Sequence, residues 1–170
     1  MKSQETEQIT TRPVQREDEP FLLALYISTR EAELGAVGWD AEQIGLFCQM
    51  QFMAQRRQYA LSYPNSDDRI ILNDKNAIGH IIVDRDKEIC LVDLALVPEY
   101  RGKGIGTSLL QQLISEAVAA GKLLRLHVLS NNPAIRLYER LGFLLVGNNG
   151  IYWEMVRSPD LNQTVSAVVS

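Results

Sequence analysis

Apolar residues in the first third of the chain recur at helical spacing. Asp18 is a suitable N-cap and Pro20 suits a first turn, so a helix is predicted from there through Tyr26. A second helix is predicted from Asp40, because Asp40 and Gln43 have the spacing of a capping box. Most of the apolar stripe on this helix is expected to be core, and it comprises Ile44, Phe47, Cys48 and residues 50–54.

Shorter apolar runs between turn residues predict strands along most of the remaining chain. An edge strand is expected at 10–14, since Pro13 cannot donate to the interior of a ladder, and a loop at 63–68. Further strands are predicted at 69–72, 77–83, 89–97, 123–129, 143–146 and 151–156, and further helices at 105–120 and 133–141. The order strand, helix, strand over 89–129 requires a parallel pair. The predicted fold class is therefore α/β (α+β), with a mixed, mostly antiparallel sheet of about six or seven strands and about four helices.

Length and composition restrict the class of protein. A chain of 170 residues with 46% hydrophobic and 22% charged residues fits one globular domain over 1–170, with a core of about 10–157 and a C-terminal tail at 158–170. A net charge of −4 argues against a nucleic-acid-binding surface. The polar N-terminus does not resemble an export signal, and the apolar run 21–27 is too short to span a membrane. We expect a cytoplasmic protein with reduced thiols at Cys48 and Cys90.

Three glycines at alternating positions separate the strand at 89–97 from the following helix. Without Cβ atoms at Gly102, Gly104 and Gly106, backbone N–H groups can approach an anion closely. The N-terminus of a helix also favours phosphate, and Arg101 and Lys103 add positive charge. The segment therefore predicts a diphosphate site, with a tight turn that binds nothing as the alternative. It matches neither a Walker A loop nor the GxGxxG fingerprint of dinucleotide-binding folds.

Candidate titrating residues are few. Asp93 lies in the central strand, where a carboxylate needs a partner; it is predicted to orient a water or bind an amine, with pairing to a neighbouring strand or loop as the alternative. His80 and His127 are each expected to be histidines satisfied within the sheet, with a role as a base as the alternative. With only two histidines and no paired cysteines, no metal site is predicted.

Two blocks of the sequence resemble the GCN5-related N-acetyltransferase (GNAT) superfamily, in particular members of bacterial type. Residues 92–107, Val-Asp-Leu-Ala-Leu-Val-Pro-Glu-Tyr-Arg-Gly-Lys-Gly-Ile-Gly-Thr, resemble its acetyl-CoA signature. Residues 131–143, Asn-Asn-Pro-Ala-Ile-Arg-Leu-Tyr-Glu-Arg-Leu-Gly-Phe, are similar to its second block. The two blocks occur in the family's order, and the resemblance covers about residues 10–157.

The resemblance implies a GNAT-like sheet with a splayed parallel pair, and acetyl-CoA bound between the two strands. Backbone groups of Leu94, Leu96 and Val97 would bind pantetheine. The diphosphate would be held by Arg101, Gly102, Lys103, Gly104, Ile105, Gly106 and Thr107. Asn131 and Ala134 would line the other side of the cofactor. Tyr138 matches the family's general acid, with packing against Leu141 or Phe143 as the alternative.

The activity that the resemblance implies is transfer of an acetyl group from acetyl-CoA to a primary amine. The amine of a small molecule or peptide would attack the thioester directly, within a ternary complex. A homodimer is possible, and no nucleic-acid or membrane partner is expected. The alternatives are an acyl-CoA-binding or regulatory module of the same fold that does not catalyse transfer, and an NAD-dependent enzyme, which lacks its fingerprint here.

Overall fold

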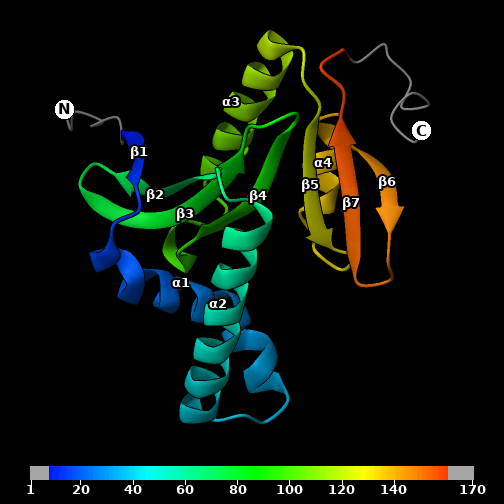
Figure 1. Ribbon diagram of the computed structural model, residues 1–170. Helices are drawn as coiled ribbons and strands as arrows, with labels where there is room; N and C mark the ends of the chain where they lie inside the picture. Colours follow the sequence, from blue (N-terminus) through cyan, green and yellow to red (C-terminus); the bar gives the residue numbers. More distant parts are fainter. Residues whose placement is uncertain (1–7, 161–170) are drawn as a thin grey trace, which may run out of the picture. The chain divides into compact units, whose positions relative to one another are not determined.

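The computed structural model describes residues 8–160. Within this range the chain forms seven strands, four α-helices and two short 3-10 helices. The strands belong to one sheet in the order β1-β2-β3-β4-β5-β7-β6 (Figure 1). The strand pair β4–β5 is parallel, whereas β1–β2, β5–β7 and β6–β7 are antiparallel. The predicted mixed, mostly antiparallel sheet is confirmed.

The chain divides into two compact units that share strand β4. The first unit contains the chain through Ile82 together with Asp93–Gly106. The second unit contains Val83–Val92 and the chain from Thr107 onward. The single acetyltransferase domain expected over 1–170 stays a prediction, and most of the C-terminal tail expected at 158–170 lies outside the described residues.

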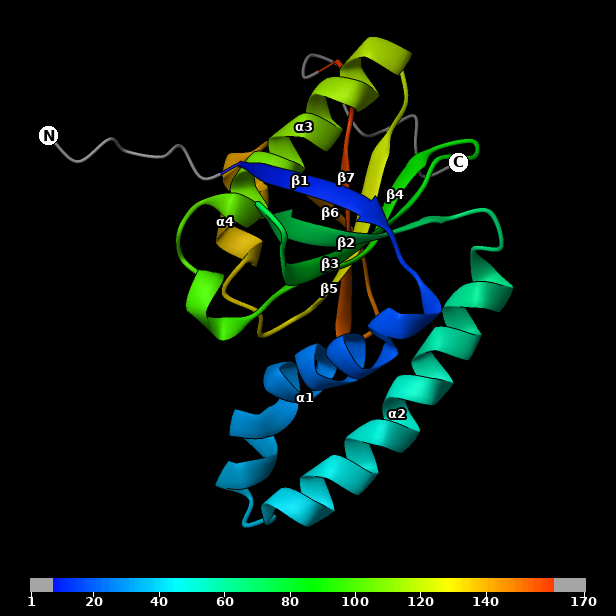
Figure 2. The same ribbon diagram turned by 90° about the vertical axis from the view of Figure 1, so that its left-hand side faces the viewer.

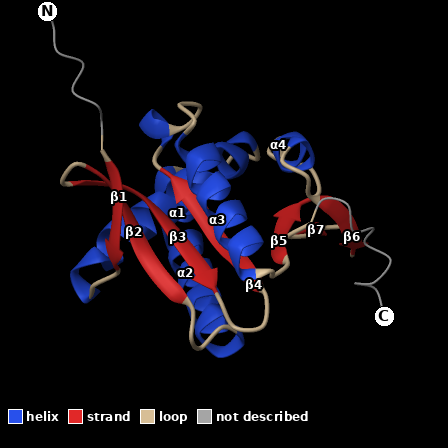
Figure 3. Ribbon diagram, turned by 90° about the horizontal axis from the view of Figure 1, so that it is seen from above, coloured by secondary structure: helices blue, strands red, loops and turns tan. Residues whose placement is uncertain are grey.

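Strands β1 to β3 of the first unit lie side by side, with β1 at the edge (Figure 3). Their bounds are Ile9–Pro13, Asp67–Asn73 and Asn76–Asp84, and β4 spans Ile89–Leu96. Asp74 has φ 53° in the two-residue turn between β2 and β3, a conformation that Asp tolerates better than most residues. The loop predicted at 63–68 is too long, because Asp67 and Asp68 already belong to β2.

Helices α1 (Glu19–Ala36) and α2 (Ala41–Ser62) belong to the first unit and lie next to each other, joined by a short loop (Figure 2). The predicted capping box is present: Gln43 N–H donates to Asp40 Oδ1 at 2.9 Å, and Asp40 N–H donates to Gln43 Oε1 at 3.0 Å. The predicted cap at Asp18 is wrong in its detail. Asp18 precedes α1, but its carboxylate accepts two hydrogen bonds from Arg12, each of 2.7 Å, instead of capping the helix.

The core of the first unit lies between these helices and the sheet. Leu22 and Phe52 pack against Ile70 of β2, and all three are buried. The stripe predicted to be mostly core on α2 is divided, however. Phe52 is buried, whereas Met50 is 72% exposed and Met53 55% exposed. Periodicity marks an apolar side of a helix, but only the tertiary structure decides how much of that side is covered.

The second unit contains β5 (Leu124–Leu129), β7 (Tyr152–Arg157) and β6 (Leu144–Asn148), which lie side by side in this order (Figure 3). Its helices are α4 (Ile135–Arg140) and most of α3 (Ile105–Ala120), and α3 ends before Gly121, which has φ 63°. The helix predicted at 133–141 is shorter in the structure. Pro133 and Ala134 form a turn instead, in which the side chain of Asn132 accepts the Ala134 N–H at 2.9 Å.

The parallel ladder between β4 and β5 is short. It pairs Ile89–Leu91 with Leu124–Leu126. Strand β4 continues to Leu96, and β5 pairs with β7 over its full length to Leu129. The second half of β4 therefore extends beyond this ladder, as expected for a splayed parallel pair.

Candidate active site

The second half of β4 presents alternate backbone groups to its two sides. Val97 N–H donates to the Ile78 carbonyl of β3 at 2.8 Å. A Cβ built on Gly79 of β3 would lie 2.5 Å from the Ala95 carbonyl oxygen. Residues 95 and 97 therefore use their backbone groups toward β3. Because these groups alternate in direction along a strand, Leu94 and Leu96 direct theirs to the opposite edge.

The glycine-rich segment leads from the 3-10 helix at Pro98–Tyr100 directly into α3. Gly102 has φ 72° and Gly104 φ 82°, a region that side-chain-bearing residues rarely adopt. Gly106 has no such backbone requirement, yet no atom lies within 4 Å of the position that its Cβ would occupy. No packing contact among residues 8–160 outside the helix's own backbone therefore explains glycine at position 106. A ligand that approaches the first turn of α3 closely would explain it.

Both cations of this segment contact groups of the first unit. Arg101 donates from Nε to the Leu96 carbonyl at 2.9 Å and from a terminal nitrogen to Ser28 Oγ at 3.1 Å. Lys103 Nζ lies over the ring of Tyr100, 5.1 Å from its centroid, a cation–π geometry. Arg101 thus attaches the glycine-rich segment to the end of β4 and to α1.

Asp93 of β4 is close to a histidine that sequence reasoning treated separately. His80 Nδ1 lies 4.0 Å from Asp93 Oδ2, and His80 Nε2 makes a short hydrogen bond to Asp68 Oδ1. Burial raises the pKa of Asp93 above its ordinary value, while His80 and the Leu94 N–H oppose that increase. A third of the Asp93 side chain is still exposed (33%). Asp93 is therefore surrounded by protein yet accessible.

Two arginines on the helices complete the surroundings of these acids. Arg56 of α2 lies 3.5 Å from Asp68 Oδ2, and its guanidinium lies over the ring of Phe52. Arg30 of α1 lies over the ring of Tyr26 and favours the ionised form of Asp93. The expectation of a histidine satisfied within the sheet is correct for His80. The sequence did not predict Asp68 as the partner of His80 or Arg30 as a neighbour of Asp93, because neither strand register nor helix packing can be read from the sequence.

The residues predicted from the second block belong to the second unit. Tyr138 of α4 packs edge-on against Phe143, with ring centroids 5.8 Å apart. Asn131 is exposed, and Ala134 is partly buried at the start of α4. Thr107 in the first turn of α3 belongs to the same unit. The structure thus gathers Asp93, Leu94, Leu96, Val97 and residues 101–106 in one unit, and Thr107, Asn131, Ala134 and Tyr138 in the other.

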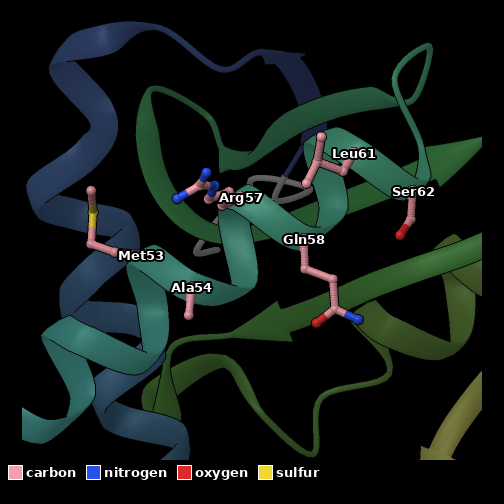
Figure 4. A pocket seen from close by; sticks show the side chains of 6 residues that line it. All are labelled: Met53, Ala54, Arg57, Gln58, Leu61 and Ser62. Carbon is pink, nitrogen blue, oxygen red and sulfur yellow. The ribbon is translucent and has the colours of Figure 1, made fainter.

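A depression of about 590 Å³ lies along the C-terminal half of α2 (Figure 4). Its lining residues all come from this helix and are Met53, Ala54, Arg57, Gln58, Leu61 and Ser62. Met53 therefore lines a surface depression and is not a core residue. Within residues 8–160 no group of three or more His, Cys, Asp or Glu residues is arranged to hold a metal ion.

Residues 20–143, well over half of the sequence, match the family model described as "Acetyltransferase (GNAT) family". The protein belongs to the GNAT acetyltransferase family, whose cofactor is acetyl-CoA. No curated protein is significantly similar in sequence. Within the described range, none of the helices is both long and apolar enough to cross a membrane.

Solved structures share this fold at low sequence identity. The PaiA N-acetyltransferase of Thermoplasma acidophilum, solved with coenzyme A, is similar with TM-score 0.67 and 22% identity, over 89% of this chain and 99% of that one. A spermidine N-acetyltransferase SpeG chimera from Vibrio cholerae and hSSAT is similar with TM-score 0.61 and 20% identity, over 92% of this chain and 99% of that one. The ribosomal-protein-S18-alanine N-acetyltransferase of Escherichia coli is similar with TM-score 0.58 and 22% identity, over 90% of this chain and 95% of that one.

Proposed function

We propose that the protein transfers an acetyl group from acetyl-CoA to a primary amine, which attacks the thioester directly within a ternary complex. One observation carries the proposal. A glycine-rich segment with open space at all three glycines begins a helix of 16 residues, directly after a strand edge to which Leu94 and Leu96 contribute backbone groups. This arrangement offers an extended pantetheine a strand to pair with and a diphosphate a helix N-terminus.

The residues present fit the cofactor. The N–H groups in the first turn of an α-helix have no partners within the helix, and the open position at Gly106 lets an anion approach them. The Leu94 carbonyl and the Leu96 N–H are the proposed pantetheine contacts. The Leu94 N–H is bonded to Asp93, the Leu96 carbonyl to Arg101 and the Val97 N–H to β3. When bound, acetyl-CoA supplies an acetyl group activated as a thioester. Asn131 and Ala134 keep the role that the second sequence block suggests.

Asp93 is the proposed acceptor of the amine proton. An alkyl ammonium with a pKa of about 10.4 is almost entirely protonated at neutral pH, so a base must remove one proton before attack. A deep carboxylate with one accessible side can attract the cation and then accept its proton at Oδ. Its raised pKa makes the carboxylate a stronger base than an exposed aspartate.

Tyr138 is the proposed general acid, on the strength of its place in the second block. Its ring is held against Phe143, which orients the phenol. Tyr138 Oη would hold the proton that the departing sulfur takes. The names of two structural neighbours state their acceptors, spermidine and an alanine of ribosomal protein S18, so small polyamines and peptides with a free amine are the first acceptor classes to examine.

Two measurements test the proposal in order. Calorimetric titration with acetyl-CoA is expected to give binding, and titration with NAD is expected to give none. Release of free thiol is then followed with spermidine, a peptide with N-terminal alanine, and aminoglycoside and amino-acid panels. Turnover with any amine supports the enzyme. Binding without turnover across the panel assigns a non-catalytic acyl-CoA module instead, and the absence of binding at millimolar acetyl-CoA overturns both.

A further inference from the structure

A row of three titrating side chains crosses three neighbouring strands of the first unit. Asp68 lies on β2, His80 on β3 and Asp93 on β4. The imidazole of His80 is 8% exposed, and its two nitrogens face the two carboxylates. The outer member, Asp68, is 31% exposed. The row therefore connects the proposed base with a carboxylate that solvent can reach.

The contacts of His80 determine where its proton resides. An ionised carboxylate only accepts hydrogen bonds, so the bond to Asp68 requires a hydrogen on His80 Nε2. In a neutral imidazole Nδ1 is then a bare acceptor, and it faces the Asp93 carboxylate. Two acceptors facing each other repel unless one of them is protonated. Asp93 and His80 are thus arranged to share a single proton.

The charged groups of the neighbouring helices keep this row balanced. Arg56 of α2 compensates Asp68, and Arg30 of α1 favours the ionised form of Asp93. Cys48 of α2 is buried, which raises the pKa of its thiol, so it contributes no charge at neutral pH. The proton that enters at Asp93 therefore changes the charge of the row itself, and Cys48 takes no part in that change.

We propose that His80 relays the proton of the acceptor amine from Asp93 to Asp68, and that it positions Asp93 for the next cycle. This inference rests on the proposed function and on Asp93 as the base. The ammonium gives one proton to Asp93 Oδ, which passes it to His80 Nδ1. His80, now an imidazolium, releases the proton on Nε2 to Asp68, and Asp68 releases it to water. Exchange of one proton with water then returns His80 to the tautomer that carries its hydrogen on Nε2. Each transfer breaks one bond to hydrogen and forms another, and water is the only other reactant.

The separation of 4.0 Å between His80 Nδ1 and Asp93 Oδ2 is too long for a direct hydrogen bond. A bridging water, or an approach of about 1 Å, completes the path. In this relay His80 acts on the acceptor only through Asp93, so it is a positioning and relay residue and not a catalytic one.

The decisive experiment needs no acceptor substrate. Long-range proton–nitrogen NMR spectra of the whole protein are recorded from pH 5 to 9, and the chain's two histidines make the spectra simple. His80→Gln assigns the signals, and the exposed His127 on β5 serves as internal reference. We expect neutral His80 to carry its hydrogen on Nε2. Asp93→Asn places an amide opposite His80 Nδ1 in place of the carboxylate, so the Nδ1 signal of His80 should shift in this variant.

The results separate the relay from the proposed function. A hydrogen on Nδ1, or a His80 Nδ1 signal that is unchanged in Asp93→Asn, overturns the relay and leaves acetyl transfer untouched. An inactive protein with the expected spectra would contradict the function alone. Thermal unfolding first checks that Asp93→Asn and His80→Gln are folded; if Asp93→Asn is not, Asp93→Ser replaces it.

With an acceptor from the amine panel, the rate against pH gives a second test. His80→Gln retains a donor for Asp68 but cannot take up a proton, so kcat should fall about tenfold and one ionisation should disappear from the kcat/KM profile. Asp68→Asn should change the profile in the same direction, and His127→Gln should leave it unchanged. A profile of unaltered shape in His80→Gln would show a purely structural histidine and overturn the relay.

Discussion

Arg101 donates from Nε to the carbonyl oxygen of Leu96 at 2.9 Å, which attaches the proposed diphosphate segment to the strand that would hold pantetheine. A second bond joins Arg101 to Ser28 Oγ of α1. The side chain of Arg101 therefore holds the glycine-rich segment to the end of β4 and to α1. In the sequence it reads simply as a positive charge next to three glycines, and its role as a brace follows only from the contacts.

The role of Arg101 can be measured with two variants. Arg101→Ala should raise the Kd for coenzyme A about three- to tenfold, because it removes two hydrogen bonds of roughly 0.5–1.5 kcal/mol each that position the segment, and only part of that free energy affects binding. Ser28→Ala should give part of this effect, because it removes one of the bonds. Calorimetry gives both values. A loss of a hundredfold or more in Arg101→Ala, with no effect of Ser28→Ala, would mean that the guanidinium binds the diphosphate directly.

Variants at Gly104 and Gly106 can distinguish the effect of backbone strain from the effect of a ligand that approaches closely. Gly106→Ala should leave the unliganded protein at least as stable, since the site is open and alanine favours a helix by about 1 kcal/mol. The same variant should lose most of the thermal stabilisation that coenzyme A provides. Gly104→Glu should abolish binding, because a negative side chain enters the anion site. Gly104→Ala is its control for the strain at φ 82°.

Equal thermal shifts with coenzyme A in wild type and Gly106→Ala would contradict a close approach at this glycine. Thermal unfolding with and without about 1 mM coenzyme A detects the difference, because the stabilisation grows with the logarithm of the ratio of ligand concentration to Kd.

Tyr138→Phe should lower kcat by more than about tenfold and leave coenzyme A affinity similar. Phenylalanine retains the ring that packs against Phe143, so the fold is expected to persist. Tyr152, exposed on β7, provides the matched control, and Tyr152→Phe should be fully active. Steady-state kinetics with the identified amine decides the matter. Unchanged turnover in Tyr138→Phe would remove Tyr138 from the mechanism.

Gly79 is required by the close packing of β3 against β4. A Cβ there would lie 2.5 Å from the Ala95 carbonyl oxygen and 2.7 Å from a Leu96 methyl carbon, so Gly79→Ala should destabilise the protein by about 2–3 kcal/mol. Gly45 lies within α2 with open space around it, and Gly45→Ala should stabilise by about 0.5–1 kcal/mol. Urea unfolding of both variants tests the pair, and a neutral Gly79→Ala would show that the strands separate easily.

The Arg12–Asp18 pair makes stability depend on pH in the acid range. Hydrogen bonds from Arg12, and one from the Gln15 N–H, lower the pKa of Asp18 to about 2 from 3.8. Because the folded pKa lies below the unfolded one, the contribution is complete above about pH 4 and is lost as pH falls through about 2. It amounts to about 1 kcal/mol once screening at the partly exposed Arg12 is included.

Asp18→Asn should therefore be less stable than wild type at pH 7 and nearly equal to it at pH 2. Urea unfolding at pH 7, 4 and 2 measures the difference. A difference that is constant across this range would assign the effect to lost packing or altered hydrogen bonding, and not to the ionised carboxylate.

Much of the fold could be predicted because its signals are local. The capping box of Asp40 and Gln43 and the glycine after α3 depend on residues only a few positions apart. Errors arose where distant contacts compete with local preference. Asp18 binds Arg12 in place of the helix, and Asp68 joins β2 in place of a loop, because each gains a partner that no local pattern reveals.

The sequence by itself determined the order of strands and helices, the family, and the glycine-rich segment, since turn chemistry, periodicity and motif spacing are properties of neighbouring residues. Only the tertiary structure decided that Asp68, His80 and Asp93 form one row, that Arg101 turns back to Leu96, and that much of the apolar side of α2 is exposed. These relationships depend on strand register and helix packing, which bring together residues from 5 to 73 positions apart in the chain.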